Sequence, residues 1–231
     1  MAAPALSIVI PAYNEEQRLG PTLARILEWG RDRSIEVVVS DDGSRDRTRE
    51  VAAAAGVRVV GYAKNRGKGS AVRTGMLAAD GARVLMCDAD LATPIEELDK
   101  LGAELDRGAD LAIGSRALDR SLIEERQHPM RELMGRTFNG IVRLLVLGGI
   151  KDTQCGFKLF TRAAAQDLFG RATVDGFAFD VEILWLARGR FRIAEVPVVW
   201  RHVEESKVSP GTDAMRMFAD VIKLRLRHGR R

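Results

Sequence analysis

The chain has 231 residues, of which 46% are hydrophobic and 29% charged, and a net charge of +4, values typical of a folded globular protein. Its two cysteines, Cys87 and Cys155, exclude a disulfide framework, so we expect free thiols and a cytoplasmic, reducing location. The sequence shows neither a secretory signal nor a run of about 18 apolar residues, which excludes a membrane-spanning helix.

Apolar runs typical of short strands alternate with helical patterns through the first half of the chain. Strands are predicted at residues 6–10, 35–39, 57–60, 84–87 and 110–113, and helices at 16–29, 46–55, 68–79 and 94–107. This alternation favours an α/β fold with a Rossmann-like, mostly parallel central sheet flanked by helices. The length suits a single domain over residues 1–231.

The second half is less regular. Residues 116–131 are polar and typical of a mobile loop over a site, and residues 131–147 predict an amphipathic helix with a broad apolar side. There follow a strand at 157–160, a helix at 179–187, a strand ending at Trp200 and an amphipathic helix at 214–227. The amphipathic helices suit either a solvated surface or the lipid interface. The basic residues of 223–231 either complement a helix dipole or attract an anionic surface.

Asp88 and Asp90 follow the fourth predicted strand and form the only Asp-x-Asp pattern in the chain. Two carboxylates at this spacing repel each other unless a cation lies beside them. A hard divalent ion such as Mg²⁺ or Mn²⁺, itself bound to phosphate oxygens, would meet that need. The alternative is a strand end followed by a helix cap, because Thr93-Pro94 is typical of a helix start.

Three other predicted strands also end in polar groups. These groups are Pro11-Ala12-Tyr13-Asn14-Glu15, Asp41-Asp42-Gly43-Ser44 and Gly114-Ser115-Arg116. Parallel strands carry their carboxyl ends to one edge of a sheet, so we expect all of these groups to converge on one cleft. Taken singly, Asn14 or Ser44 could instead cap a helix and Gly43 could supply a turn.

The segment Asn65-Arg66-Gly67-Lys68-Gly69-Ser70 lacks the Walker spacing and is not a P-loop. Gly67 and Gly69 nevertheless permit a close approach of the backbone, so we expect this loop, with Lys68, to lie near a nucleotide. No glycine-rich dinucleotide turn follows the first strand.

These motifs occur in the order seen in glycosyltransferase family 2, which the chain resembles over nearly its whole length. Three further segments resemble the polyprenyl-phosphate branch of that family, above all its glucosyl members. They are Asp152-Thr153-Gln154-Cys155-Gly156-Phe157-Lys158, Phe179-Asp180-Val181-Glu182 and Glu195-Val196-Pro197. The resemblance implies a GT-A fold, with a nucleotide-sugar-binding half at 1–116 and an acceptor-binding half with membrane-facing helices at 117–231.

The resemblance also implies a reaction. We expect an inverting, metal-dependent transfer of a hexose, glucose first, from a UDP-hexose to polyprenyl or dolichyl phosphate, with Mg²⁺ or Mn²⁺ as cofactor. GDP-mannose or UDP-N-acetylhexosamine as donor, and a soluble glycan as acceptor, remain alternatives. Membrane-embedded relatives carry anchor helices that this sequence lacks, so we expect peripheral attachment at the cytoplasmic face of the membrane or a membrane-protein partner.

Site residues follow from the matching motifs. The residues expected to bind the donor nucleotide are Pro11, Tyr13, Glu15, Asp41, Asp42, Lys68 and Asp88. The expected metal ligands are Asp88 and Asp90, and the expected catalytic residues are Asp90, Arg116 and Asp152. The expected acceptor-phosphate ligands are the basic side chains Arg126, Arg131, Arg136 and Lys207.

Three roles stay open at this level. Asp152 could orient the acceptor or the sugar, act as a weak base, or merely form a turn. Asp180 and Glu182 could touch sugar hydroxyls or pair with Arg188 and Arg190. A nucleic-acid-binding module is not expected, because no aromatic residues interleave with the basic tail and the aromatic content is 6%.

Overall fold

The protein folds around a seven-stranded sheet in the order β3-β2-β1-β4-β6-β5-β7. The computed structural model describes residues 3–125, 140, 148–201 and 212–228. Its strands are β1 (Leu6–Ala12), β2 (Ile35–Asp41), β3 (Arg58–Gly61), β4 (Arg83–Met86), β5 (Leu111–Ser115), β6 (Lys158–Thr161) and β7 (Ile193–Pro197). The neighbouring pairs are parallel except those of β6, which runs antiparallel to both β4 and β5.

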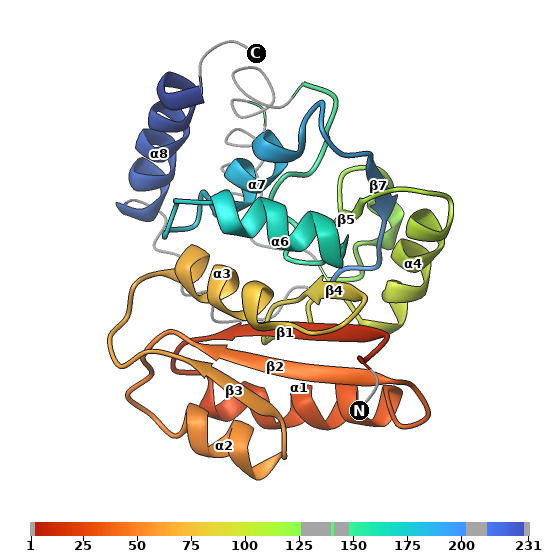
Figure 1. The fold of residues 1–231 in the computed structure, drawn as a ribbon, viewed down its shortest axis with the longest axis vertical. Coiled ribbons are helices and arrows are strands. Elements are labelled where there is room, and N and C mark those ends of the chain that lie inside the picture. The colour runs from red at the N-terminus through yellow and green to blue at the C-terminus, as the bar shows by residue number, and fades with distance from the viewer. Residues whose placement is uncertain (1–2, 126–139, 141–147, 202–211, 229–231) are drawn as a thin grey trace.

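Helices cover both faces of this sheet. They are α1 (Glu16–Trp29), α2 (Thr48–Ala54), α3 (Lys68–Ala78), α4 (Leu98–Asp106), α6 (Arg162–Arg171), α7 (Phe179–Ala187) and α8 (Thr212–His228), with short 3₁₀ turns η1 (Ile95–Glu97) and η2 (Arg120–Leu122). In Figure 1, α1 and α2 lie on one side of β1, β2 and β3, and α3 lies on the other. The predicted mostly parallel α/β fold is confirmed.

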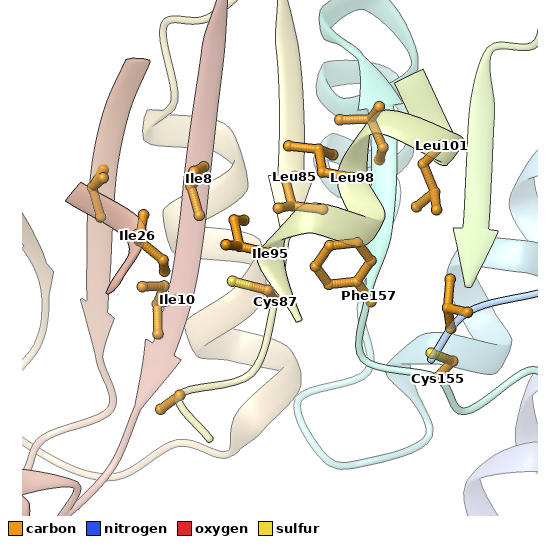
Figure 2. Close-up of a cluster of buried hydrophobic side chains, with 14 of the residues drawn as sticks. Ile8, Ile10, Ile26, Leu85, Cys87, Ile95, Leu98, Leu101, Cys155 and Phe157 are labelled. Carbon is orange, nitrogen blue, oxygen red and sulfur yellow. The ribbon is translucent and has the colours of Figure 1, made fainter. Parts of the chain in front are cut away.

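Alternation along the strands explains the two layers, because successive strand residues point to opposite faces. Val9 and Met86 face the layer of α3, α6 and α7, where they pack with residues such as Met76. Ile8 and Leu85 face the layer of α1 and α4. Figure 2 shows the latter core, in which Ile8, Ile95, Cys87 and Phe157 lie together.

Reversal of β6 brings a second chain segment to the edge where the parallel strands end. Lys158 begins β6 and pairs with Met86 at the end of β4 and with Ile113 near the end of β5. The residues that precede β6, from Asp152 to Phe157, therefore lie beside the residues that follow β4. Neither this reversal nor helix α6 was predicted from the sequence.

The predictions for residues 116–131 and 131–147 compare with the structure as follows: one needs correction, and the other concerns residues that the structure does not describe. The loop predicted from residue 116 contains η2, and Ile123 forms a bridge with Trp200, so this part is ordered rather than a plain loop. The predicted helix 131–147 lies outside the described residues, apart from residue 140. So do Arg126, Arg131, Arg136 and Lys207.

Helix α8 packs through Val221 and Leu224, and not through the apolar side that its sequence pattern indicates, which includes Phe218, Ile222 and Leu226. Val221 and Leu224 are buried against the protein, and Val221 belongs to the core beneath α7. Phe218, Ile222 and Leu226 are 40%, 40% and 79% exposed. Across the described ranges, no helix is both long and apolar enough to cross a bilayer.

Candidate active site

The carboxyl ends of β1, β2, β4 and β5 lie at one edge of the sheet, as the alternation of strands and helices predicted. A pocket opens at this edge, but its lining does not include the predicted residues that follow β1, β2 and β5. It is lined by Cys87, Asp88, Asp90, Leu91, Ala92, Thr93, Gly156, Phe157 and Trp200. The pocket thus joins the loop after β4 to the segment before β6 and to the chain that continues β7.

Asp88 and Asp90 share this pocket. Burial and the neighbouring Asp88 carboxylate raise the pKa of Asp90 above its ordinary value, although the backbone N–H of Ala92 donates to Asp90 Oδ1 at 3.0 Å. The hydroxyl of Thr22 donates to the carbonyl of Ala89 at 2.6 Å and so fixes the turn between the two carboxylates.

The two carboxylates suit a divalent cation, because each disfavours the charge of the other and a cation would relieve both. Within the described part of the chain, no cluster of three or more His, Cys, Asp or Glu side chains could form a complete metal cage. Most ligands of such an ion would therefore come from phosphate oxygens and water. This is the pattern by which Mg²⁺ binds at nucleotide sites.

Lys68, the first residue of α3, reaches the same carboxylates. Its Nζ lies 2.7 Å from Asp88 Oδ1. Burial alone would lower the pKa of Lys68, but the carboxylates of Asp88 and Asp180 together raise it above its ordinary value. Lys68 thus contacts the Asp-x-Asp motif directly, and its role in binding the donor nucleotide remains a prediction.

Gly156 is required for this arrangement. A Cβ at this position would lie 2.0 Å from Asp88 Oδ2, so any larger residue would displace the Asp88 carboxylate from this position. Next to it, Cys155 is a free, buried thiol, and burial raises its pKa to about 11. Cys155 is consequently unsuited to act as a nucleophile.

Arg116 and Asp152 form a two-point ion pair next to Trp200, one of the residues that line the pocket. Arg116 Nε donates to Asp152 Oδ2 at 2.7 Å, Nη2 donates to Oδ1 at 2.9 Å, and the Arg116 backbone N–H adds a third bond. Burial opposes the charge of Asp152, yet Arg116 lowers the pKa of Asp152 to about 2. The guanidinium also lies 5.6 Å from the ring centre of Trp200, which faces the pocket.

This geometry bears on the roles that the sequence left open for Asp152. Both carboxylate oxygens accept hydrogen bonds from Arg116, and a carboxylate with a pKa of about 2 is a very weak base. The backbone N–H of Gln154 also donates to Asp152 Oδ1 at 3.2 Å, as in the turn alternative. A catalytic role for Asp152 remains a prediction.

Glu195 holds this pair in place, a function that sequence reasoning missed. Its carboxylate accepts hydrogen bonds from the backbone of Lys151 and Asp152 and from the Ser115 hydroxyl at 2.7 Å. The segment Glu195-Val196-Pro197 had been noticed only as part of a motif. Trp200 was missed as well, because a tryptophan at a strand end is also common in cores.

The acidic pair at the end of β2 is buried and bound within the protein. Asp41 accepts from the backbone of Gly43 and Ser44 and pairs with Arg49 Nε at 2.7 Å. Asp42 accepts from Asn65 Nδ2 and from the backbone N–H groups of Arg66 and Gly67. Asp42 thus ties the glycine loop to the sheet edge, and donor contact by either carboxylate remains a prediction.

The end of β1 is arranged similarly. Pro11 is buried in β1, Asn14 adopts a left-handed φ of 53°, and its side chain accepts from the backbone of Arg45. Glu15 accepts from Arg18 Nε at 2.9 Å, and Tyr13 follows Ala12 at the strand end. These residues lie at the same edge as Asp41, which pairs with Ala12 across β1 and β2.

The partners of Asp180 and Glu182 differ from Arg188 and Arg190, which the sequence offered as one alternative. Asp180 forms an ion pair with the buried Lys158, and Glu182 accepts from Thr173 and Val174. Arg190 pairs instead with Asp167. Lys158 itself was missed, although a single lysine inside the apolar run of residues 157–160 indicates a buried partner.

The sequence is similar to known enzymes over most of its length. Residues 7–169 match the family described as glycosyl transferase family 2. Dolichyl-phosphate beta-glucosyltransferase of Homo sapiens is 40% identical, and the alignment covers 96% of this chain and 75% of the human protein. The protein of the same name from Saccharomyces cerevisiae is 35% identical, with 96% and 74% covered.

Solved structures share the fold. Glucosyl-3-phosphoglycerate synthase of Mycobacterium tuberculosis, crystallised with phosphoglyceric acid, is similar with a TM-score of 0.75 at 24% identity, covering 96% of this chain and 80% of that chain. The same enzyme crystallised with Mn²⁺ and uridine-diphosphate-glucose gives a TM-score of 0.74 at 24% identity, covering 96% and 79%. The sequence resemblance is thereby confirmed, and the chain belongs to glycosyl transferase family 2 as a glycosyltransferase of the GT-A fold.

Proposed function

We propose that the protein transfers glucose from UDP-glucose to the phosphate of a polyprenyl or dolichyl lipid, with inversion at the anomeric carbon. The observation that carries this proposal is the presence of acidic and basic side chains at one pocket. Asp88 and Asp90 line it, and Arg116, held by Asp152, lies 5.6 Å from the ring centre of Trp200, which also lines it. Such an arrangement suits a reaction between an anionic donor and an anionic acceptor.

On the donor side, Asp88 and Asp90 would hold Mg²⁺ or Mn²⁺, which when bound offsets the charge that develops on the departing diphosphate. Lys68 contributes a second positive charge next to Asp88. Pro11, Tyr13, Glu15, Asp41 and Asp42 are proposed to line the nucleoside site, since they occupy the ends of the two adjacent strands β1 and β2.

On the acceptor side, the attacking group is a phosphate monoester. Its second pKa is near about 6, so at neutral pH it is already mostly dianionic and needs no strong general base. The acceptor phosphate does need an oriented arginine, and the Asp152 carboxylate fixes Arg116 in one geometry. Arg126, Arg131, Arg136 and Lys207 are proposed to complete this phosphate clamp.

Inversion follows from a single displacement. A phosphate oxygen of the acceptor donates an electron pair to the anomeric carbon from the face opposite the nucleotide. The bond from that carbon to the donor's diphosphate breaks, and its electron pair leaves with UDP. The low basicity of Asp152 favours this direct route over one that requires proton removal by the protein.

Helix α8 supports a lipid acceptor. Phe218, Ile222 and Leu226 recur every four residues and so form one exposed apolar stripe. Lys223 and Arg225 lie on the same helix, and basic side chains beside an apolar stripe favour an anionic membrane surface. We propose that this stripe rests on the cytoplasmic face of the membrane, near the lipid chain of the acceptor.

The test is a transfer assay. The protein is incubated with Mn²⁺ or Mg²⁺, a polyprenyl phosphate and, in turn, UDP-glucose, GDP-mannose and UDP-N-acetylglucosamine, and the lipid product is identified by mass. Glucosyl-phosphoryl lipid from UDP-glucose is the expected product. Transfer from another donor, or transfer only to water-soluble glycans, would replace this proposal with the corresponding alternative.

A further inference from the structure

Two ion pairs, Lys158–Asp180 in the interior and Lys68–Asp88 at the pocket, involve the first turns of α7 and α3. Lys158 Nζ donates to Asp180 and to the carbonyl of Cys155, and the exposed fractions of the two paired side chains are only 1% and 7%. At the pocket, Lys68 Nζ lies 2.7 Å from Asp88 Oδ1.

A gain in folding stability does not explain the buried Lys158–Asp180 pair. Removing two charges from water costs about as much as their attraction returns, so a buried ion pair adds little to folding compared with apolar residues of similar size. Lys158 lies at the start of the central strand β6, between β4 and β5, where an apolar side chain would pack without that cost. The pair therefore needs another explanation.

A second acidic residue of α7 acts on the same region through the backbone. Glu182 accepts from the backbone N–H of Thr173 at 2.9 Å, from that of Val174 at 2.8 Å, and from the Thr173 hydroxyl. These bonds fix the segment that precedes α7. Glu182 is 1% exposed, so this contact lies inside the protein.

That segment supports the start of α3. Gly67 has a φ of 112°, and a Cβ there would lie 2.4 Å from the carbonyl oxygen of Asp175. A Cβ at Gly69 would lie 2.4 Å from the carbonyl oxygen of Val174. The backbone N–H of Ser70 donates to the Asp175 carbonyl at 3.2 Å. The glycine loop and Lys68 thus rest directly on residues that Glu182 holds.

We propose that the first turn of α7 is a positioning element for Lys68. Glu182 fixes the 173–176 segment under the glycine loop, and the Asp180–Lys158 pair holds the first turn of α7 against β6, so that Lys68 stays at the pocket beside Asp88. Asp180 and Glu182 then act without touching the sugar. This inference rests on the proposed nucleotide donor but not on the identity of the acceptor.

The test measures nucleotide binding rather than turnover. In the double variant Lys158→Met with Asp180→Leu, both charges disappear and neither is left unpaired, so we expect the fold to persist in circular dichroism. Calorimetry with Mn²⁺ should show about a tenfold loss of affinity for UDP, the order expected for one charged hydrogen bond, and no change for uridine, which carries no phosphate. The matched control is Asp167→Asn, which breaks the exposed pair with Arg190 and should change neither affinity.

A second variant keeps the inference falsifiable if the double variant does not fold. Glu182→Gln retains the side-chain length and should also lower the affinity for UDP but not for uridine. Unchanged UDP affinity in a folded variant, or an equal loss for uridine, would overturn the positioning role. Wild-type protein that binds UDP but glucosylates no lipid phosphate would contradict the proposed function and leave the positioning result standing.

Discussion

The guanidinium of Arg116 and the carboxylate of Asp152 meet through two parallel hydrogen bonds of 2.7 and 2.9 Å, beneath the ring of Trp200 and beside the Asp-x-Asp pocket. Glu195 fixes the turn that carries Asp152. Because these contacts join the end of β5, the segment before β6 and the β7 region, the orientation of Arg116 depends on several distant parts of the fold.

Replacing Asp152 should therefore affect the acceptor step. In Asp152→Asn, an NH₂ group replaces one carboxylate oxygen and cannot accept a hydrogen bond from Arg116. We therefore expect turnover to fall by about 10- to 100-fold, the effect of one or two charged hydrogen bonds. Affinity for UDP should stay within about twofold. Steady-state kinetics and calorimetry measure both quantities, with Asp106→Asn, at an exposed pair with Arg83, as the control. An unchanged turnover number would remove Asp152 from the mechanism.

The same pair predicts a dependence of stability on pH. The pKa of Asp152 falls from its ordinary 3.8 to about 2 in the folded protein, so its contribution is present above the ordinary pKa and is lost as the pH falls through the folded value. Its size is about 2 kcal/mol. Urea unfolding at pH 5 and near pH 2 should show wild type losing about that much more free energy of unfolding than Asp152→Asn. Equal losses in both proteins would mean that the ion pair does not lower this pKa.

The sequence predicted the strands and the meeting of their polar ends because both depend on local patterns. Apolar runs punctuated by polar turns define β1, β2 and β4, and parallel connection through helices then fixes which ends lie together. This is why Asp88, Asp90 and Arg116 could be grouped in one site before the structure. Motif spacing alone would not have shown that Gly156 must be glycine for Asp88 to fit.

What sequence could not provide depends on contacts between distant segments. The apolar run from Phe157 to Phe160 predicts a strand but not its direction. That β6 runs antiparallel is visible only from its pairing with β4 and β5. The partner of Lys158 is 22 positions away on α7. Likewise, α8 has two apolar stripes, and only packing decides that Val221 is buried while Leu226 is exposed.

The proposed metal site predicts a loss of Mn²⁺ affinity when Asp90 is replaced. Asp90→Asn removes one of the two proposed carboxylate ligands, so Mn²⁺ affinity measured by electron paramagnetic resonance in the presence of UDP should fall by about tenfold or more. EDTA should abolish sugar transfer by the wild type, and added Mn²⁺ should restore it. The control is Asp99→Asn, an exposed carboxylate of α4 that pairs with Arg33. Transfer that persists in EDTA would exclude the proposed cation.

The exposed stripe of α8 predicts how the protein meets a membrane. Leu226→Glu places a charge where an apolar side chain would enter the interface, and it should reduce flotation with anionic vesicles while leaving UDP binding unchanged. Leu77→Glu is the matched control, because Leu77 is an exposed leucine (38%) on the different helix α3. Binding should weaken as salt rises, since each basic residue near the surface contributes about 1 kcal/mol. Equal flotation of wild type and Leu226→Glu at low salt would mean that α8 is not the lipid-facing surface.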